Sequence, residues 1–226
     1  GLKKGTVVSR EERLPLGQLV RSGFAAARNP RIALAYACAF IARGDLVVIG
    51  TFVNLWGTNA GMEAGMDPAE ATAQGRLLFG AATGAGLLWL PVMGYMLDKV
   101  NRVTGTLICM SLAALGFLFT DLVDDPLAKE SLIFFVLLGI GQISAFVGAA
   151  TLIGQEAPIA SRGAVIGLFN ISGAVGIFVC TALGGRLFDV IGPHAVFEMV
   201  GGLTVLVVLF AVWVRWKAPG PMATGG

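Results

Sequence analysis

Six apolar segments, each about as long as a bilayer-spanning helix, constrain this chain more than any other feature. A bilayer core needs about 20 mostly apolar residues per helix. The segments that approach or exceed this length lie at residues 32–56, 77–97, 103–120, 132–154, 163–185 and 195–214. Only 13% of the 226 residues are charged, whereas soluble domains average about 25%. Because a helix satisfies its own backbone hydrogen bonds in lipid, we predict an all-α membrane protein with six transmembrane helices.

The segment before the first span is polar and basic. Within it, apolar residues recur at helical spacing, at Leu16, Leu19, Val20, Phe24 and Ala27, while Arg21 and Arg28 lie off that stripe. This pattern suggests a short amphipathic helix on the membrane surface, and a flexible linker explains it equally well. We therefore divide the chain into a cytoplasmic linker (1–31), a transmembrane unit (32–217) and a cytoplasmic tail (218–226). Because residue 1 is glycine, we expect a fragment or a processed chain.

Basic residues gather on one side of the predicted membrane. Of the 16 lysines and arginines, the twelve on that side are Lys3, Lys4, Arg10, Arg13, Arg21, Arg28, Arg31, Lys99, Arg102, Arg162, Arg215 and Lys217. Cytoplasmic loops of membrane proteins are enriched in such residues. We therefore expect an integral protein of the bacterial plasma (inner) membrane with both termini in the cytoplasm. The acidic loops 57–75 and 121–131 would face outside. Three tryptophans fall near predicted span ends, where aromatic belts form: Trp56, Trp213 and Trp216.

The residues that enzymes and metal sites need are sparse. Cys38, Cys109 and Cys180 fall in different apolar runs, so we interpret them as packing residues. His194, the single histidine, is expected to be a solvated loop residue. No nucleophile–base pair or metal-ligand cluster is evident, so we expect no enzyme activity, no metal and no cofactor. We also expect no nucleic-acid partner; the lipid bilayer is the expected environment.

Two stretches of the chain repeat one pattern. The second span ends Gly94-Tyr-Met-Leu-Asp98-Lys-Val-Asn101, and the fifth ends Gly185-Arg-Leu-Phe-Asp189-Val-Ile-Gly192, an offset of 91 residues. The offset pairs the middle span of the first three helices with the middle span of the last three. This is the expected trace of a 3+3 inverted repeat, which builds many transporter folds. Coincidence in a glycine-rich chain is the alternative.

The stretch Gly94-Tyr-Met-Leu-Asp98-Lys99-Val-Asn101-Arg102 closely resembles the signature loop of the major facilitator superfamily. In that family the loop joins the second and third helices of each six-helix half, as it does here. Asn101 stands where the family usually has glycine. Because asparagine tolerates a left-handed turn better than most residues, this departure is mild.

A second stretch, from Glu156 through Pro158, Arg162 and Gly163 to Gly167, resembles the turn between helices ten and eleven of the same family. Together the two stretches make this chain resemble the C-terminal half, helices seven to twelve. The resemblance implies secondary active transport of a small solute by alternating access, coupled to protons. It also implies an N-terminal six-helix half as partner, which is missing here. A non-transporting membrane scaffold, or a half-transporter that needs a partner half, is the alternative.

The resemblance further implies a cytoplasmic gate. In this family the signature loop latches the two halves together while the outside is open. We expect the gating set to comprise Gly94, Asp98, Lys99, Arg102, Glu156 and Arg162.

Polar residues inside the spans are the candidates for substrate or proton binding. Arg43 and Asp45 lie near the middle of the first span, where a charge costs roughly 2.5–3.5 kcal/mol. Two residues apart on a helix, they cannot face the same surface. An arginine that faces the cavity would suit an anion, and an aspartate that faces the cavity would suit proton coupling; the sequence does not choose between them, and a buried structural ion pair is the alternative. The other candidates are Asn54, Gln142 and Asn170, for which hydrogen bonds between helices are at least as plausible.

Two small-residue motifs predict close helix contacts. Gly80 and Gly84 lie four residues apart in the second span, and Gly163 and Gly167 have the same spacing in the fifth. Small residues at this spacing let two backbones approach each other.

Overall fold

The computed structural model describes residues 16–220, which form helices joined by short connections and include no strand. Six helical stretches are long and apolar enough to cross a membrane. In chain order they are α2 (Pro30–Val48) continued by a π-helical turn (Ile49–Val53) and α3 (Asn54–Glu63), then α4 (Pro68–Lys99), α5 (Arg102–Leu118), α6 (Leu132–Glu156), α7 (Arg162–Val190) and α8 (Pro193–Lys217). The predicted class, an all-α membrane protein with six spans, is confirmed.

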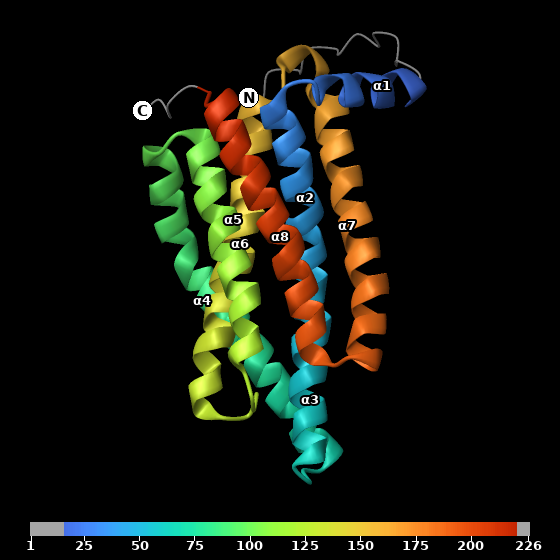
Figure 1. Ribbon diagram of the computed structural model, residues 1–226, viewed down its shortest axis with the longest axis vertical. Helices are drawn as coiled ribbons and strands as arrows, with labels where there is room; N and C mark the ends of the chain where they lie inside the picture. The colour runs from blue at the N-terminus through green and yellow to red at the C-terminus, as the bar shows by residue number, and fades with distance from the viewer. Residues whose placement is uncertain (1–15, 221–226) are drawn as a thin grey trace, which may run out of the picture.

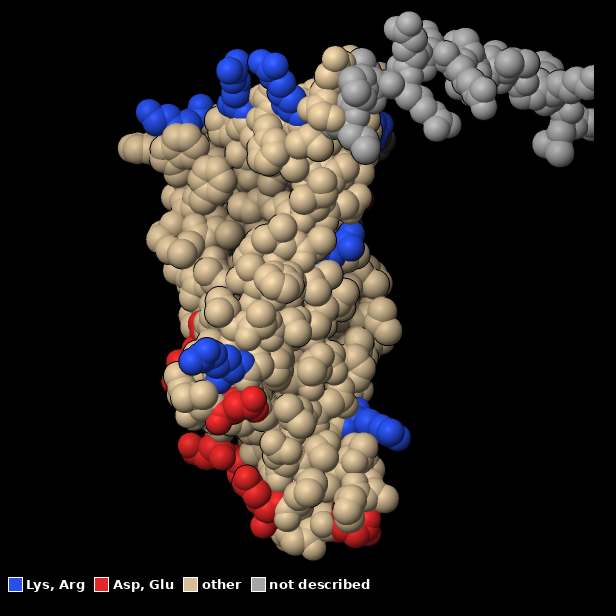
Figure 2. Space-filling model, turned by 90° about the vertical axis from the view of Figure 1, so that its right-hand side faces the viewer, with Lys and Arg blue, Asp and Glu red and all other residues tan. Residues whose placement is uncertain are grey.

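The six spans form an elongated bundle, and the short helix α1 (Leu16–Ala26) lies across one end of it (Figure 1). The C-terminal end of α8, the α4–α5 connection and the α6–α7 connection lie at the same end as α1. The other three connections lie at the opposite end. Figure 2 shows basic side chains at the first end, acidic side chains together with a few basic ones toward the second, and a largely uncharged surface between them. This separation is the charge pattern on which the predicted orientation rests.

The contacts between spans follow a regular scheme. If α2 is exchanged with α6, α4 with α7 and α5 with α8, the α2–α7 contact becomes α6–α4, and α2–α8 becomes α6–α5. The α2–α6 and α5–α8 contacts map onto themselves. These pairs agree with a 3+3 inverted repeat, whereas the contact of α3 with α4 has no comparable counterpart between α6 and α7. The repeat itself stays a prediction.

Glycines set the closest of these contacts. A methyl group on Gly139 of α6 would overlap the carbonyl oxygen of Ala82 on α4, and one on Gly176 of α7 would overlap the carbonyl of Phe40 on α2. Ser172 Oγ also donates a hydrogen bond to the Tyr36 carbonyl, at 2.8 Å, and so joins α7 to α2. Lipid offers little hydrophobic drive for helix association, so such backbone approaches carry the packing.

Within the described residues, the two predicted small-residue motifs do not make these contacts. A Cβ added to any of their four glycines would have no neighbouring atom within 4 Å. Their spacing permits a close contact, but whether another helix lies opposite depends on how the bundle is assembled. In this bundle both motifs face open surface.

The predicted outer loop 57–75 is largely helical, which corrects the span boundaries. The first span continues to Glu63, and α4 begins at Pro68. The Asp67 carboxylate caps α4 by accepting hydrogen bonds from the N–H groups of Ala69 and Glu70, at 2.8 and 3.1 Å. Hydropathy detects only the apolar part of a helix, so the polar turns beyond the bilayer were assigned to a loop.

Trp56 belongs to the core rather than to an aromatic belt. Only 5% exposed, it packs against Phe135, His194 and Phe197 at the acidic end of the bundle. His194 is therefore partly buried against a ring rather than fully solvated, because the first turn of α8 lies beside Trp56 at the start of α3. Trp213 and Trp216 are 47% and 86% exposed.

We predict that Gly139→Ala destabilises the bundle much more than Gly84→Ala. The first methyl group would meet the Ala82 carbonyl, whereas the second has open space. Overpacking of this kind costs about 1–3 kcal/mol or more. Thermal unfolding of the two purified variants in the same detergent checks this, and equal melting temperatures would contradict the assigned α4–α6 contact.

Candidate functional site

A layer of polar side chains separates two apolar clusters of the core. One cluster, near the basic end, includes Ile41, Ala145 and Phe169. The other, near the acidic end, includes Val48, Leu138 and Cys180. On each of α2, α6 and α7, the polar residues singled out from the sequence fall between these positions: Arg43, Asp45, Gln142 and Asn170. Polar groups in the middle of a membrane protein are costly, and this layer is therefore the first candidate site.

Arg43 on α2 is partly exposed, and its side chain contacts both α6 and α7 within this layer. Its Nη2 donates a hydrogen bond to Asn170 Oδ1 on α7, at 3.3 Å. Its guanidinium carbon lies 5.8 Å from the ring centre of Phe146 on α6. The aliphatic stem runs against Gly173, where an added Cβ would lie 2.6 Å from Arg43 Cγ. The structure thus brings together Arg43 and Asn170, two of the predicted residues.

Asp45 points elsewhere. Its side chain is 0% exposed, and neither carboxylate oxygen has a hydrogen-bond partner among the residues the structure describes. Gly44, between the two charges, packs against Cys180 and the Gly176 carbonyl of α7. Arg43 and Asp45 make no ion pair with each other, so the alternative of a structural pair finds no support.

Asn54 and Gln142 do not join the Arg43 group. Asn54 Nδ2 donates to the Gly50 carbonyl at 2.7 Å, across the π-helical turn. A π-helical turn (Ile49–Val53) lies between Arg43 and Asn54, so the two residues are not joined by one regular α-helix. Gln142 is 8% exposed, inside the bundle. π-helical turns such as the one at Ile49–Val53 occur frequently at functional sites.

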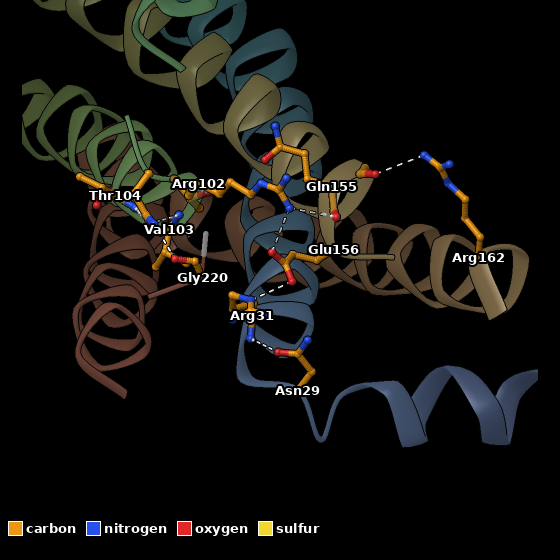
Figure 3. A network of polar contacts seen from close by, with 12 residues as sticks. Asn29, Arg31, Arg102, Val103, Thr104, Gln155, Glu156, Arg162 and Gly220 are labelled. Atoms are coloured by element: carbon orange, nitrogen blue, oxygen red, sulfur yellow. Dashed lines mark hydrogen bonds and ion pairs between the residues drawn. The ribbon is translucent and has the colours of Figure 1, made fainter. Parts of the chain in front are cut away.

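A second polar cluster lies at the basic end of the bundle and is centred on Glu156 (Figure 3). Its Oε2 lies 2.7 Å from Arg31 Nε, and its Oε1 lies 3.6 Å from Arg102 Nη1. The Glu156 side chain is only 5% exposed, and the two arginines are about a quarter exposed. One buried carboxylate therefore joins the first turns of α2 and α5 to the last turn of α6. We call these three residues the Glu156 cluster.

Two arginines also bond to the last turn of α6. Arg102 Nη1 donates to the Gln155 carbonyl at 3.3 Å, and Arg162 Nη2 donates to the Gly154 carbonyl at 3.2 Å. Carbonyls in the last turn of a helix lack intrahelical partners and carry partial negative charge, so they favour cations. Arg102, Glu156 and Arg162 thus lie around the last turn of α6, and their role in gating stays a prediction.

The other members of that set lie apart from this cluster. Asp98 and Lys99 are exposed at the end of α4, and Gly94 has open space beside it. Lys99 Nζ lies 4.8 Å from the ring centre of Tyr95, and no ion pair of Asp98 occurs within residues 16–220. The carboxylate that organises the basic end is therefore Glu156 rather than Asp98.

Asn101 acts as a helix cap and not as a left-handed turn residue. Its φ of −55° lies outside the left-handed region, and its Oδ1 accepts hydrogen bonds from the N–H groups of Val103 and Thr104. Its Nδ2 donates to the Gly220 carbonyl at 3.1 Å. A glycine at this position could make none of these side-chain bonds.

The sequence reasoning missed Arg31 and Phe146. Arg31 was assigned to the linker, although its position at the first turn of a span next to a basic loop could have marked it. Phe146 looked like one more apolar residue of α6. Within the described part of the chain, no group of three or more His, Cys, Asp and Glu side chains is placed to hold a metal ion.

Comparison with known proteins identifies relatives of the chain. The family model for the Major Facilitator Superfamily matches residues 14–225. Magnetosome protein MamH of Paramagnetospirillum magneticum is 32% identical over 184 residues, which is 81% of this chain and 43% of that protein. Magnetosome proteins MamZ of the same organism and of Magnetospirillum gryphiswaldense are each 29% identical over 185 residues, covering 82% of this chain and 29% and 28% of those proteins. The chain thus spans less than half the length of the curated relatives it matches.

We predict that Glu156→Gln lowers the stability of the bundle by about 1.5–3 kcal/mol, the usual contribution of hydrogen bonds to charged groups. The substitution removes the negative charge that two arginines share. Asp98→Asn is the matched control at the same end, and it should change stability by less than about 0.5 kcal/mol because Asp98 is exposed. Thermal unfolding in detergent measures both variants, and equal losses would show that the Glu156 cluster does not hold these helices together.

Proposed function

Because the chain belongs to the Major Facilitator Superfamily, we propose that it is the C-terminal six-helix half of a secondary active transporter. It moves a small solute by alternating access, coupled to protons. The observation that carries this proposal is the polar layer between the two apolar clusters, where Arg43 and Asn170 meet in the middle of the bundle. Solute sites of transporters lie near the middle of the bilayer.

An N-terminal six-helix half is the proposed partner. The helices α4 and α7 both carry large exposed apolar side chains, among them Leu88 (83%) and Phe178 (73%). The same two helices carry the glycine motifs that face open surface. Exposed glycines at this spacing suit the close approach of another helix. A second six-helix unit would cover these faces and close a cavity over Arg43.

The proposed location is a bacterial inner membrane. The end of the bundle that carries α1 and the C-terminus of α8 faces the cytoplasm in this proposal. The basic residues at this end and the acidic residues at the other support this orientation. The three relatives are named magnetosome proteins, so a magnetosome membrane is a second candidate location.

The Glu156 cluster and the exposed Asp98 suggest how the cytoplasmic end could open and close. The cluster fastens α2, α5 and α6 within this half, and it leaves Asp98 free to contact the other half. A carboxylate there can accept hydrogen bonds from the N-terminus of a facing helix. In this proposal Asp98 forms the contact between halves, and Glu156 holds its surroundings rigid.

We predict that Asp98→Asn in the full-length protein slows transport while leaving the melting temperature unchanged. Loss of the charge weakens the closed cytoplasmic gate and so disturbs the alternation between states. Flux into liposomes containing equal amounts of protein measures the effect. An unchanged rate would remove Asp98 from the gate.

Asp45 is the proposed proton site. An ionised carboxylate buried without a partner is costly, and proton uptake relieves that cost. A proton that binds when one side is open and leaves when the other is open would couple its gradient to the solute.

We predict that Asp45→Asn makes solute flux independent of an imposed pH gradient while transport down the solute gradient continues. The asparagine amide has nearly the same shape as the carboxylic acid, but it neither gains nor loses a proton over this pH range. Proteoliposomes containing a trapped pH dye, with and without a pH gradient, provide the measurement. Wild-type protein that moves no solute in this assay would instead favour a non-transporting scaffold.

A further inference from the structure

We infer that the solute is an anion, and that Arg43 and Asn170 bind its negatively charged group. This inference rests on the proposed transport function, and it names the substrate class of the same site. Arg43 lies 13 residues into the first span, about 20 Å along the helix from its end at 1.5 Å per residue. Its ligand must therefore reach the middle of the bundle.

Among residues 16–220, no carboxylate pairs with Arg43. Within residues 16–220 the ion pairs involve Arg31 and Arg102, both with Glu156. The nearest carboxylate in the sequence, Asp45, is fully buried and makes no hydrogen bond or ion pair with Arg43. The helices that face Arg43 add no negative charge either, since α6 has no charged residue before Glu156, and α7 has none between Arg162 and Arg186.

The surroundings of Arg43 hold its guanidinium ready for a ligand. Gly173 leaves room for the side-chain stem to lie along α7, and Phe146 lies beside the guanidinium. Asn170 accepts one of its five N–H bonds through Oδ1. The exposed Asn170 side chain retains an amide group that can donate to the same ligand. Donors from two helices therefore converge on one place.

A partly exposed guanidinium with free N–H groups fits an oxyanion. Its planar fork matches two oxygens of a carboxylate or of a phosphate group. Both ligand classes share this chemistry, and the experiment below separates them.

The test uses the full-length protein with Ala174→Cys, an exposed position on α7 one turn beyond Asn170, so that both proposed binding residues remain. The protein is purified in detergent so that both sides are accessible. The thiol is labelled with one of two methanethiosulfonate reagents. The anionic reagent is 2-sulfonatoethyl methanethiosulfonate, and the cationic reagent is 2-(trimethylammonium)ethyl methanethiosulfonate. Cys38, Cys109 and Cys180 are buried, so protein without the new cysteine supplies the background. A nearby positive charge should favour the anionic reagent.

We expect the ratio of anionic to cationic labelling rates to fall at least about tenfold when Arg43→Gln is added. Arg43→Lys, which keeps the charge, should retain most of the preference, and it guards against a folding defect. Arg186→Gln is the matched control, since it removes an exposed arginine from α7 sixteen residues beyond Asn170. If Arg43→Gln leaves the ratio of labelling rates unchanged, the inference is overturned. The same result is expected if a carboxylate of the other half already neutralises Arg43.

Protection then identifies the ligand class. Acetate, succinate and inorganic phosphate are each added at millimolar concentration, with glycerol and choline as neutral and cationic controls. Slower labelling with the carboxylates alone assigns a carboxylate, and slower labelling with phosphate alone assigns a phosphate. Equal protection by the controls, or protection by none of the anions, overturns the site.

The labelling needs no transport. A protein that binds anions but moves no solute would therefore disprove the proposed function while keeping the anion site.

Discussion

The close approach of helix backbones at glycine is the constraint on which the rest of the bundle depends. In lipid, apolar side chains gain little by meeting each other, so the contacts that allow the nearest approach decide which helices become neighbours. Gly176 against the Phe40 carbonyl brings α7 onto α2, and Gly139 against the Ala82 carbonyl brings α4 onto α6. The first of these contacts also places Asn170 beside Arg43.

The two charges of the first span have opposite surroundings because they project from different sides of the same helix. Arg43 emerges beside Gly173 and remains partly exposed, whereas Asp45 enters the bundle and has no hydrogen-bond partner in the described part of the chain. An exposed cation suits a ligand that arrives and leaves, and a buried carboxyl suits a proton. The proposed division of roles between solute binding and proton coupling follows from this difference in exposure.

The Glu156 cluster extends the same logic to the end of the bundle. The Glu156 carboxylate on α6 pairs with Arg31 on α2 and with Arg102 on α5, and so joins three helices that are far apart in the chain. Asn101 caps α5 beside it, and Arg215 Nε donates to Thr104 Oγ1 at 2.7 Å. The ends of α2, α5, α6 and α8 are thereby held in one polar layer, which leaves Asp98 exposed on α4.

Six spans, their order and the charge asymmetry of the two ends were determined by the sequence alone, because hydrophobic length and the placement of charge are local properties. The signature stretch around Asp98 likewise identified the family, which the family match confirms. The sequence also predicted that Arg43 and Asp45 face different surfaces, because helical geometry requires it. Only the tertiary structure decided which of the two is exposed, that Gly139 and Gly176 rather than Gly80 and Gly163 make the close contacts, and that Glu156 binds Arg31. Each of these depends on which helix lies opposite, and helices distant in the chain become neighbours through backbone shape, which spacing within one segment does not encode.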